Sequence, residues 1–489
     1  RGRAMIKYFI ENIERFYTVL ESLIKDRNID KTWLEDLYNI FTLKDNQYTT
    51  PIKYHLFLAI RDNPEYLDVD LLSKVLNLSE DQVLNIFSNE GYKVYFPVYD
   101  LTNETSTVAT AFIVENTDLT LSFNEFVNLD LIKQLTNKNF FVIFDRSFKG
   151  ESYQLALVAG LIAKDKSLLE KLAFTGAITS SGRVKIVNHI QEKEKACQEL
   201  GLTLITPKDI QSVEELDFWL NSPDIPVIYL NRNTTNDLEI SLKKIEELIQ
   251  EKYKHFKIEN LLKFYNLSKE DLYHITENVN FSDRETLIEI LNQAEEKFKK
   301  LFAVKNAVLY ISITISSLAF LIGSLIGSRK RAVILHYANS SYNVAIDLSE
   351  NTRIIKQQTD NFEIIQPQEC EPSEEMALIL YIASHNPIQM VTEYIKQNLP
   401  TVKSICSVKT VNQGNLELQS FLRTHQELYT FINSVVKKKI HLFYSIPTPI
   451  ALTLGMAIEH FWDITLYHYD KMSGYIKIPV NLNEVVSKF

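Results

Sequence analysis

The sequence predicts a multidomain protein of mixed α/β and α+β class, and three observations support this. Apolar residues recur at helical spacing through the first ninety residues. From Tyr92 onward, short alternating or fully apolar runs are typical of strands. The last third of the chain repeats itself. A length of 489 residues is enough for several domains, each with its own core.

Composition excludes some classes of function. The net charge of −10 argues against general binding to duplex DNA or RNA, because that binding needs many cations; a small nucleotide needs only a local basic patch. Cys197, Cys370 and Cys406 lie far apart without CxxC spacing, so we expect neither a disulfide framework nor a metal site. This cysteine usage, with no signal-peptide pattern before Met5, indicates a cytoplasmic protein.

Residues 1–92 are predicted to be a helical region. Ile6, Ile10 and Ile13 recur at helix spacing, and Ser79 follows a break as the N-cap of a new helix. A helix-turn-helix would also fit this pattern. The segment carries little basic charge, which favours a small packing bundle instead.

Residues 93–234 are predicted to form an α+β domain. Strands are expected at 93–99, 108–114, 139–145 and 203–206. Helices are expected after Ser152 and over 188–200, with a hairpin around Ser180–Gly182. Residues 235–305 interleave acidic and basic residues at helical spacing, which predicts a solvated helical connector.

Residues 306–489 contain a repeat with an offset of 132 positions. Ser316 aligns with Thr448, Gly323 with Gly455, and the strand around His336 with the strand around His468. Each copy is predicted to run strand, Ser/Thr N-cap, helix, turn, strand. The repeat therefore indicates two Rossmann-like halves, at about 306–400 and 401–489.

The uncharged run 306–328 has the length of a membrane span. The repeat argues against that interpretation, since the matching run 441–458 contains His441, Pro447 and Pro449. In addition, residues 311–316 alternate with strand period. We therefore expect a strand followed by a short buried helix here.

Two stretches carry candidate catalytic residues. Ser152 lies where a predicted strand turns into a helix, so helix N–H groups can stabilise an oxyanion nearby. Lys193 shares its helix face with Ile190 and Cys197, whereas Lys195 does not. Burial lowers a lysine pKa, and a neutral lysine can deprotonate a serine. Alone, either residue would more commonly be an N-cap or a lysine that extends to water.

The order of motifs from Ala173 to Asp209 resembles the signature of the Lon protease domain. The matching segments are 175–179 (TGAIT), 182–184 (GRV), 190–193 (IQEK) and 206–208 (TPK). The resemblance implies a protease in which Ser152 is the nucleophile and Lys193 the base. The chain departs from the family at Glu151, Tyr153, Gln154, Ala177 and Asn188–His189. Tyr153 is expected to narrow the cleft.

No Walker A motif occurs in the sequence, so the ATPase that feeds chains to ordinary Lon is missing. We expect cleavage of a specific partner and no processive degradation. No cofactor is expected.

The repeat also carries candidate nucleotide-binding residues. Helix N-termini bind phosphates, aromatic rings stack bases, and cations add charge. The candidates lie at strand–helix turns or carry such groups: Thr314, Ser316, Ser317, Phe320, Arg329, Lys330, His336, Tyr337, Ser384, Pro447, Thr448, Pro449, Tyr467, His468 and Tyr469. Each would otherwise be an ordinary N-cap or core residue.

With its duplicated halves, this segment resembles the SAVED domain, a fusion of two CARF-like halves that binds cyclic oligonucleotides. A Lon-type protease fused to SAVED is similar to the CRISPR-associated Lon proteases of type III antiviral defence. That resemblance implies activation by a cyclic oligoadenylate, typically the tetra-adenylate, and cleavage of a partner related to anti-sigma factors. Related SAVED proteins stack head to tail on binding ligand, which predicts the same assembly here.

Two other functions remain open. The departures around Ser152 fit an inactive, nucleotide-responsive signalling adaptor. A sensor that degrades its own ligand, a ring nuclease, is a further alternative, although the sequence offers no clear catalytic pair for it.

Overall fold

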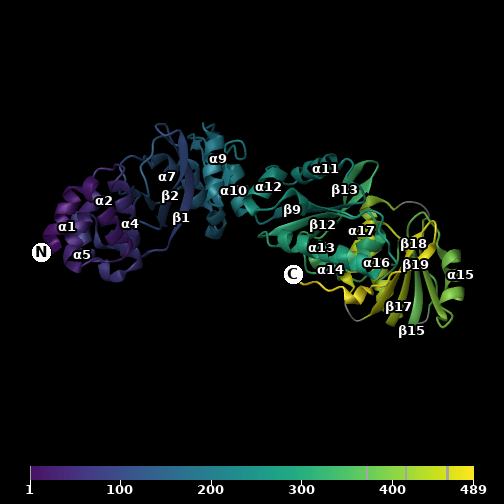
Figure 1. Cartoon of the computed structure of the whole chain (residues 1–489). Helices are drawn as coiled ribbons and strands as arrows, with labels where there is room; N and C mark the ends of the chain where they lie inside the picture. Colours follow the sequence, from purple (N-terminus) through teal and green to yellow (C-terminus); the bar gives the residue numbers. More distant parts are fainter. Residues whose placement is uncertain (1, 371–372, 413–415, 459–461) are drawn as a thin grey trace. The chain divides into compact units, whose positions relative to one another are not determined.

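The computed structural model describes residues 2–370, 373–412, 416–458 and 462–489. The chain forms two compact units, Arg1–Ser222 and Pro223–Phe489 (Figure 1). The first unit therefore joins the predicted helical region and the predicted α+β domain. The second begins before the predicted boundary at residue 234, so the two units replace the four predicted segments.

The first unit begins with six helices, as predicted for residues 1–92. They are α1 (Gly2–Glu11), α2 (Ile13–Lys25), α3 (Leu34–Tyr38), α4 (Thr49–Asp62), α5 (Val69–Leu76) and α6 (Glu80–Ser88). Ser79 caps α6, as predicted, through a capping box with Gln82. Phe57 of α4 packs on Phe141 of the sheet, with ring centroids 5.0 Å apart. The helices thus share one core with the sheet.

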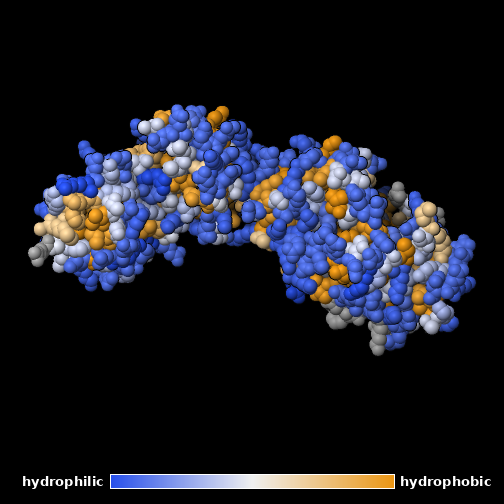
Figure 2. Space-filling view, in the orientation of Figure 1, coloured by the Kyte–Doolittle hydropathy of each residue, from blue (hydrophilic) through white to orange (hydrophobic). Residues whose placement is uncertain are grey.

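Apolar side chains on the outer helices are exposed. Met5, Tyr8 and Val19 are each between 42% and 48% exposed. Figure 2 shows orange residues gathered over this end of the first unit. Part of the helical surface is therefore apolar.

The sheet of the first unit is mixed and has the order β3-β4-β2-β1-β5-β8. Its strands are β1 (Gly91–Asp100), β2 (Thr105–Glu115), β3 (Leu121–Ser122), β4 (Phe140–Phe144), β5 (Leu172–Phe174) and β8 (Thr203–Ile205). The helices are α7 (Asp130–Thr136), α8 (Gln154–Ile162), α9 (Ile190–Glu199) and α10 (Val213–Asn221). The predicted hairpin is formed by β6 (Ala177–Ile178) and β7 (Val184–Lys185).

The second unit contains two sheets whose strands are arranged in the same order, apart from one additional edge strand in the second sheet. The first has the order β10-β9-β11-β12-β13. Its strands are β9 (Ile225–Arg232), β10 (Tyr273–Ile275), β11 (Ala307–Ser312), β12 (Ala332–Ala338) and β13 (Ser341–Asp347). The second has the order β14-β16-β15-β17-β18-β19. Its strands are β14 (Ile365–Pro367), β15 (Ser373–Tyr381), β16 (Ser404–Thr410), β17 (Val436–Ser445), β18 (Asp463–Asp470) and β19 (Gly474–Lys477).

The two sheets correspond strand by strand, with β14 as an additional edge strand. Each central strand is followed by a helix: α14 (Ser316–Ile326) follows β11, and α17 (Thr448–Ala457) follows β17. The helices that come before the central strands β11 and β17 also correspond. Helix α11 (Leu238–Gln250) matches α15 (Ile388–Asn398), and α13 (Arg284–Phe302) matches α16 (Phe421–Val435). Helix α12 (Ile258–Tyr265) has no counterpart among the described residues of the second half. The duplication predicted from the sequence is confirmed and extends further than predicted.

The predicted connector 235–305 is wrong. It supplies α11, α13 and β10 to the first half, because each charged helix has one apolar face that covers the sheet. Leu242 and Ile245 of α11 are buried in this way. The halves therefore run from β9 to β13 and from β14 to β19, so the predicted halves at about 306–400 and 401–489 are wrong in their boundaries.

The two halves meet where α14 packs on α17. A Cβ atom built on Gly323 would lie 2.2 Å from the carbonyl oxygen of Leu452, and one built on Gly455 would lie 2.3 Å from that of Phe320. The two backbones can approach this closely because neither residue has a side chain. The two glycines occupy equivalent positions in the repeat.

The uncharged run 306–328 divides into β11 and α14, as predicted from its periodicity. Across the described ranges, no helix is both long and apolar enough to span a bilayer.

The expectation that no disulfide forms is wrong for one pair. Cys370 and Cys406 are disulfide-bonded, with Cα atoms 5.8 Å apart, and they are 36 positions apart in sequence. Cys370 follows β14, which is the neighbour of β16, where Cys406 lies. Sheet topology thus joins two residues that no spacing motif relates.

Candidate functional sites

Ser152 lies in the turn between β4 and α8. Gly150 in this turn has φ +90°, a conformation that favours glycine. The Ser152 carbonyl accepts a hydrogen bond of 2.9 Å from the N–H of Gly176. The Ser152 side chain is half-buried, and the helix begins two residues later at Gln154. The residue is therefore beside the helix N-terminus, as the sequence predicted.

Lys193 projects from the buried face of α9, as predicted. It is 5% exposed, and Ala196 and Cys197 are buried on the same helix. Burial lowers the pKa of the Lys193 ammonium. Its Nζ donates a hydrogen bond of 3.4 Å to the Thr175 hydroxyl. Among the described residues, no ion pair is formed with this ammonium.

Thr175 and Gly176 connect these two residues. Thr175 binds the lysine, and Gly176 binds the backbone of Ser152. Both follow β5, and the N–H of Thr175 donates to the Ile205 carbonyl on β8 (3.0 Å). We did not predict a role for Thr175, although it begins the segment TGAIT. Lys193 is bonded to Thr175, and no direct hydrogen bond joins it to Ser152, within the described part of the chain.

Two of the departures from the Lon signature have a structural explanation. The Tyr153 side chain is 3% exposed and packs on Phe144 and Phe148, so the expectation that it narrows the cleft is wrong. His189 has φ 62°, the left-handed conformation that glycine adopts readily. Its ring stacks on Tyr99 with centroids 3.7 Å apart, which stabilises this backbone.

In the second unit, the turns from β11 to α14 and from β17 to α17 lie at the carboxyl ends of parallel strands. Thr314 donates to the carbonyl of Asn231 (2.7 Å), and Ser316 donates to the carbonyl of Ile446 (2.7 Å). These hydroxyls are thus bonded within the protein. The backbone N–H groups in the first turn of α14 remain for an anion, whereas Pro449 lacks one in α17.

Ser317 is buried and forms a cluster with two residues of the second half. Its hydroxyl hydrogen-bonds to the Tyr444 hydroxyl and lies 2.7 Å from Nδ1 of His468. The His468 ring stacks on Phe281 at 3.9 Å. Burial lowers the pKa of His468.

His336 is the counterpart of His468 and packs on Phe421, with ring centroids 5.0 Å apart. Burial also lowers the pKa of His336. Each histidine therefore contacts an aromatic residue of the other half, which lies just before the long helix (Phe281) or begins it (Phe421). The two sites differ because Ser317 in the first half corresponds to Pro449 in the second.

The tyrosine candidates separate into exposed and buried residues. Tyr337 is 49% exposed, and Tyr469 is half-buried and stacks on His385 (4.8 Å) beside the exposed Ser384. Tyr467 is fully buried, and its hydroxyl lies 2.8 Å from Nδ1 of His441. Tyr467 is therefore a core residue, which corrects its predicted role.

Phe320 is also fully buried, with its ring against Tyr444. It belongs to the α14–α17 contact, so its predicted role is corrected as well. Pro447 and Thr448 stay half-buried at the start of α17. Asn231 and Phe281 were not predicted, because they lie before the recognised repeat at 306–489. Tyr444 was also not predicted, although it lies inside the matching run 441–458.

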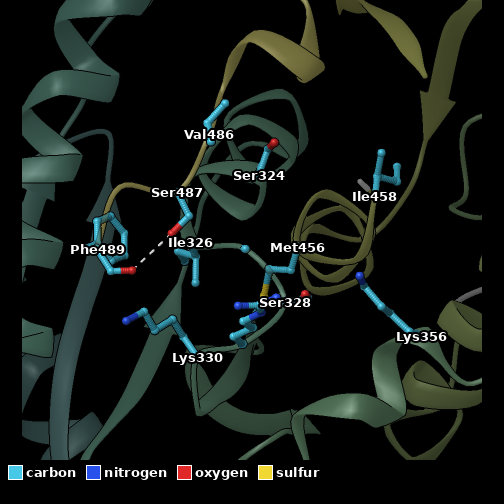
Figure 3. Close-up of a pocket in the computed structure, with 12 residues that line it drawn as sticks. Ser324, Ile326, Ser328, Lys330, Lys356, Met456, Ile458, Val486, Ser487 and Phe489 are labelled. Atoms are coloured by element: carbon cyan, nitrogen blue, oxygen red, sulfur yellow. Dashed lines mark hydrogen bonds between the residues drawn. The ribbon is translucent and has the colours of Figure 1, made fainter. Parts of the chain in front are cut away.

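Arg329 and Lys330 do not lie with the other candidates. They line a cavity of ≈ 640 Å³ at the opposite end of α14, together with Met456, Ser487 and Phe489 (Figure 3). Helix α14 has 11 residues, which places its two ends about 16 Å apart. Lys330 lies over the rings of Phe302 and Phe489. The prediction that these cations share the phosphate site at Ser316 is wrong.

Comparison with known proteins identifies the family of one segment. Residues 290–478 match the SAVED family, described as the SMODS-associated and fused to various effectors sensor domain. The match begins within α13 and ends after β19, inside the second unit. The second unit therefore contains a SAVED sensor domain. No curated protein matches the chain in sequence.

Solved structures with similarity to the chain include Cap4 SAVED/CARF-domain receptors. One from Acinetobacter baumannii with the cyclic trinucleotide 3′3′3′-cAAA is 18% identical over 44% of this chain and 50% of its own, with TM-score 0.31. A second, with 2′3′3′-cAAA, is 16% identical over 55% and 53%, with TM-score 0.33. The Moraxella osloensis receptor is 11% identical over 60% and 64%, with TM-score 0.34. The chain thus spans about half to two thirds of their length.

Proposed function

We propose that the protein is a cyclic-oligonucleotide-activated serine protease. The SAVED unit binds the ring, and the first unit cuts a specific partner protein. One observation carries the protease assignment. Lys193 is buried, forms no ion pair with any described residue, and is bonded to Thr175, whose neighbour Gly176 hydrogen-bonds to Ser152. A lysine with a lowered pKa can act as a general base toward a serine hydroxyl.

The ligand proposed is a cyclic oligoadenylate, with the tetra-adenylate as the first candidate. The SAVED match and the resemblance to CRISPR-associated Lon proteases support this assignment. At the carboxyl ends of the strands, N–H groups of α14 are available to phosphate, and Tyr337 and Tyr469 offer rings to bases. The partner follows from the same resemblance: an anti-sigma-factor-like protein.

Proteolysis of candidate partners tests this function. The purified chain is incubated with proteins encoded nearby and with cyclic oligoadenylates of different sizes, and products are separated on a gel. We expect one partner to be cut at a defined site when the activating ring is present. If ring binding recruits a partner that stays intact, the adaptor function is the correct one. The missing Ser152–Lys193 hydrogen bond is the observation that favours that alternative.

The cleavage rate is expected to rise with pH. Protonated Lys193 cannot accept the serine proton, so activity requires the neutral amine and is lost as pH falls through the lysine pKa. Burial lowers that pKa, so the rise is expected below 10.5, the ordinary value for lysine. The pH profile of kcat/KM measures this, with ring affinity determined at each pH as the control. A profile that is flat, or that rises only near 10.5, contradicts the assignment.

The two solvent-accessible tyrosines, Tyr337 and Tyr469, are expected to contribute to ring binding. Tyr337→Ala and Tyr469→Ala should each weaken binding by about 1–3 kcal/mol, the usual contribution of base stacking. Tyr467→Phe serves as the matched control, because that ring is buried away from the site. Isothermal titration calorimetry measures all three affinities. Equal losses in all three variants would show that the effect is structural.

Ring binding is also proposed to assemble the chain. The two halves of the second unit are similar but not identical, so a ring held by one molecule can be capped head to tail by another. Ligand drives this assembly only if it binds the assembled state more tightly. Light scattering should therefore show a mass increase on ring addition. A monomeric mass at saturating ring, with full cleavage activity, contradicts assembly as the switch.

A further inference from the structure

A groove of ≈ 390 Å³ opens on the first unit, where β7, the start of α9 and the segment after β8 meet. This volume is within the range of ligand-binding pockets, about 300–1,000 Å³. Ile186, Val187, Ile190 and Pro207 provide its apolar wall, and Arg183 and Lys208 provide its charge. The lining contains no carboxylate. The groove is therefore apolar within and cationic at its edge.

Contacts connect this groove to Ser152. Val184 lines the groove, and its Cγ1 atom lies 2.7 Å from the position that a Cβ atom on Gly176 would take. Gly176 in turn donates to the Ser152 carbonyl. On α9, Ile190 lines the groove three residues before Lys193, at a spacing that places both on adjacent turns of one face. The groove is therefore lined by elements that also position Ser152 and Lys193.

The residues at the edge are available to a partner. Ile186 is 92% exposed, and Arg183, Lys185 and Lys208 are exposed. Within the described residues, none of these three cations forms an ion pair. A single exposed isoleucine is ordinary on a protein surface. Here, however, the exposed isoleucine borders an apolar groove and lies among unpaired cations. Such a surface is complementary to a peptide in which an apolar side chain has acidic neighbours.

We propose that this groove binds an extended segment of the protein substrate in which a large apolar residue is flanked by acidic residues. The apolar side chain enters between Ile186, Val187 and Pro207, and the carboxylates lie against Arg183 and Lys208. This inference rests on the proposed protease function. It specifies the substrate class: protein segments recognised by their local sequence, an apolar residue with acidic neighbours. The net charge of the whole chain is −10, so the cationic edge is a local feature that an acidic segment can recognise.

Binding of synthetic peptides to the full chain carrying Ser152→Ala tests the groove without catalysis. Two short fluorescein-labelled peptides are compared by anisotropy: one has a leucine flanked by glutamates, and the other has the same leucine flanked by lysines. We expect the glutamate peptide to bind about tenfold more tightly. The double variant Arg183→Glu/Lys208→Glu should reverse the preference. Ile186→Asp should weaken binding of the glutamate peptide.

Matched controls are Lys195→Glu, an exposed charge on α9 outside the groove, and Leu119→Asp, an exposed leucine on the same unit. Both should leave peptide affinity unchanged. Equal affinity for the two peptides, or an unchanged preference in the double variant, overturns the proposal. A self-association that Ile186→Asp abolishes and the peptide does not displace also overturns it, since the occupant is then a second copy.

The groove assignment and the protease function can be contradicted separately. If the partner is cut with Ser152 present and Ile186→Asp cuts it at the same rate, the groove assignment is wrong and the protease function stands. If Ser152→Ala still cuts the partner, the protease function is wrong whatever the peptides show.

Discussion

Replacing Ser152 with alanine, or Lys193 with methionine, is expected to reduce ring-activated cleavage by about 10⁴-fold or more, the scale seen when a catalytic nucleophile or its base is removed. Alanine removes the attacking oxygen. Methionine keeps the length of the lysine side chain and removes the amine that would take the serine proton. Because the two residues act in one proton transfer, the double variant should be no slower than either single variant. Quantified gel cleavage measures the loss.

Two controls separate catalysis from folding. Lys195→Met and Ser180→Ala change exposed residues of the same types on the same unit and should retain full activity. Lys193→Met should also melt no lower than the parent chain, because burying an ammonium without an ion pair costs stability and a thioether does not carry that cost. A clear fall in melting temperature would assign the lost activity to misfolding. Unchanged cleavage in either single variant would remove that residue from the mechanism.

Gly323→Val is expected to disrupt the second unit. Even its Cβ would lie 2.2 Å from the Leu452 carbonyl oxygen and 3.0 Å from the Met456 nitrogen, and both atoms belong to the backbone of α17. A backbone cannot yield as a flexible side chain can, so α14 and α17 must separate. We expect a loss of about 3 kcal/mol or more in the free energy of unfolding of this unit. Ring binding should fail with it, because the proposed ligand site takes residues from both halves.

Comparison with two other glycines tests the cause. Gly455→Val should be equally damaging, since a Cβ there lies 2.3 Å from the Phe320 carbonyl oxygen. Gly474→Ala meets no atom within 4 Å, but its φ of +77° should cost about 1 kcal/mol through backbone strain alone. Urea unfolding followed by calorimetry of ring binding measures all three. If Gly323→Val costs no more than Gly474→Ala, the close helix contact is not required.

Much of the candidate protease site could be predicted, because its residues lie in short, ordered motifs. The face of α9 that carries Lys193 follows from helix periodicity, and the turn of Ser152 follows from the strand before it. The contact between Lys193 and Thr175 could not be predicted, since it depends on how β5 lies against α9. The groove at Ile186 could not be predicted from the sequence either, because it forms where a hairpin, the start of a helix and the segment after β8 meet.

The duplication was visible only where its spacing is constant. Gly323 and Gly455 align at the offset of 132, and so do the strands of His336 and His468. The preceding strands, β9 and β15, start 148 positions apart, at Ile225 and Ser373, so they fell outside the alignment. The charged helices in residues 235–305 also made the first half hard to recognise. Each has one apolar face and charged residues on its other faces, so the segment was predicted to be a solvated connector.

Two errors in the ligand site could have been avoided by geometry alone. Tyr467 precedes Tyr469 by two residues in β18, which places it about 7 Å farther from the carboxyl end of the strand, where the ligand site is predicted. Arg329 and Lys330 follow a helix that begins at the phosphate-binding turn, so the helix length separates them from it. The disulfide of Cys370 and Cys406, in contrast, could not have been predicted in this way, since only the order of strands in the sheet brings these residues together.

The most direct test of the central claim needs no substrate. A fluorophosphonate probe bonds to a serine oxygen with loss of fluoride, and only a deprotonated or activated serine reacts quickly. The parent chain and Lys193→Met are treated with the probe, with and without cyclic tetra-adenylate, and peptide mass spectrometry locates the adduct. We predict modification of Ser152 in the parent chain when the ring is present, and little in Lys193→Met. Equal modification of both chains at Ser152, with or without the ring, would contradict a serine–lysine pair controlled by the SAVED domain.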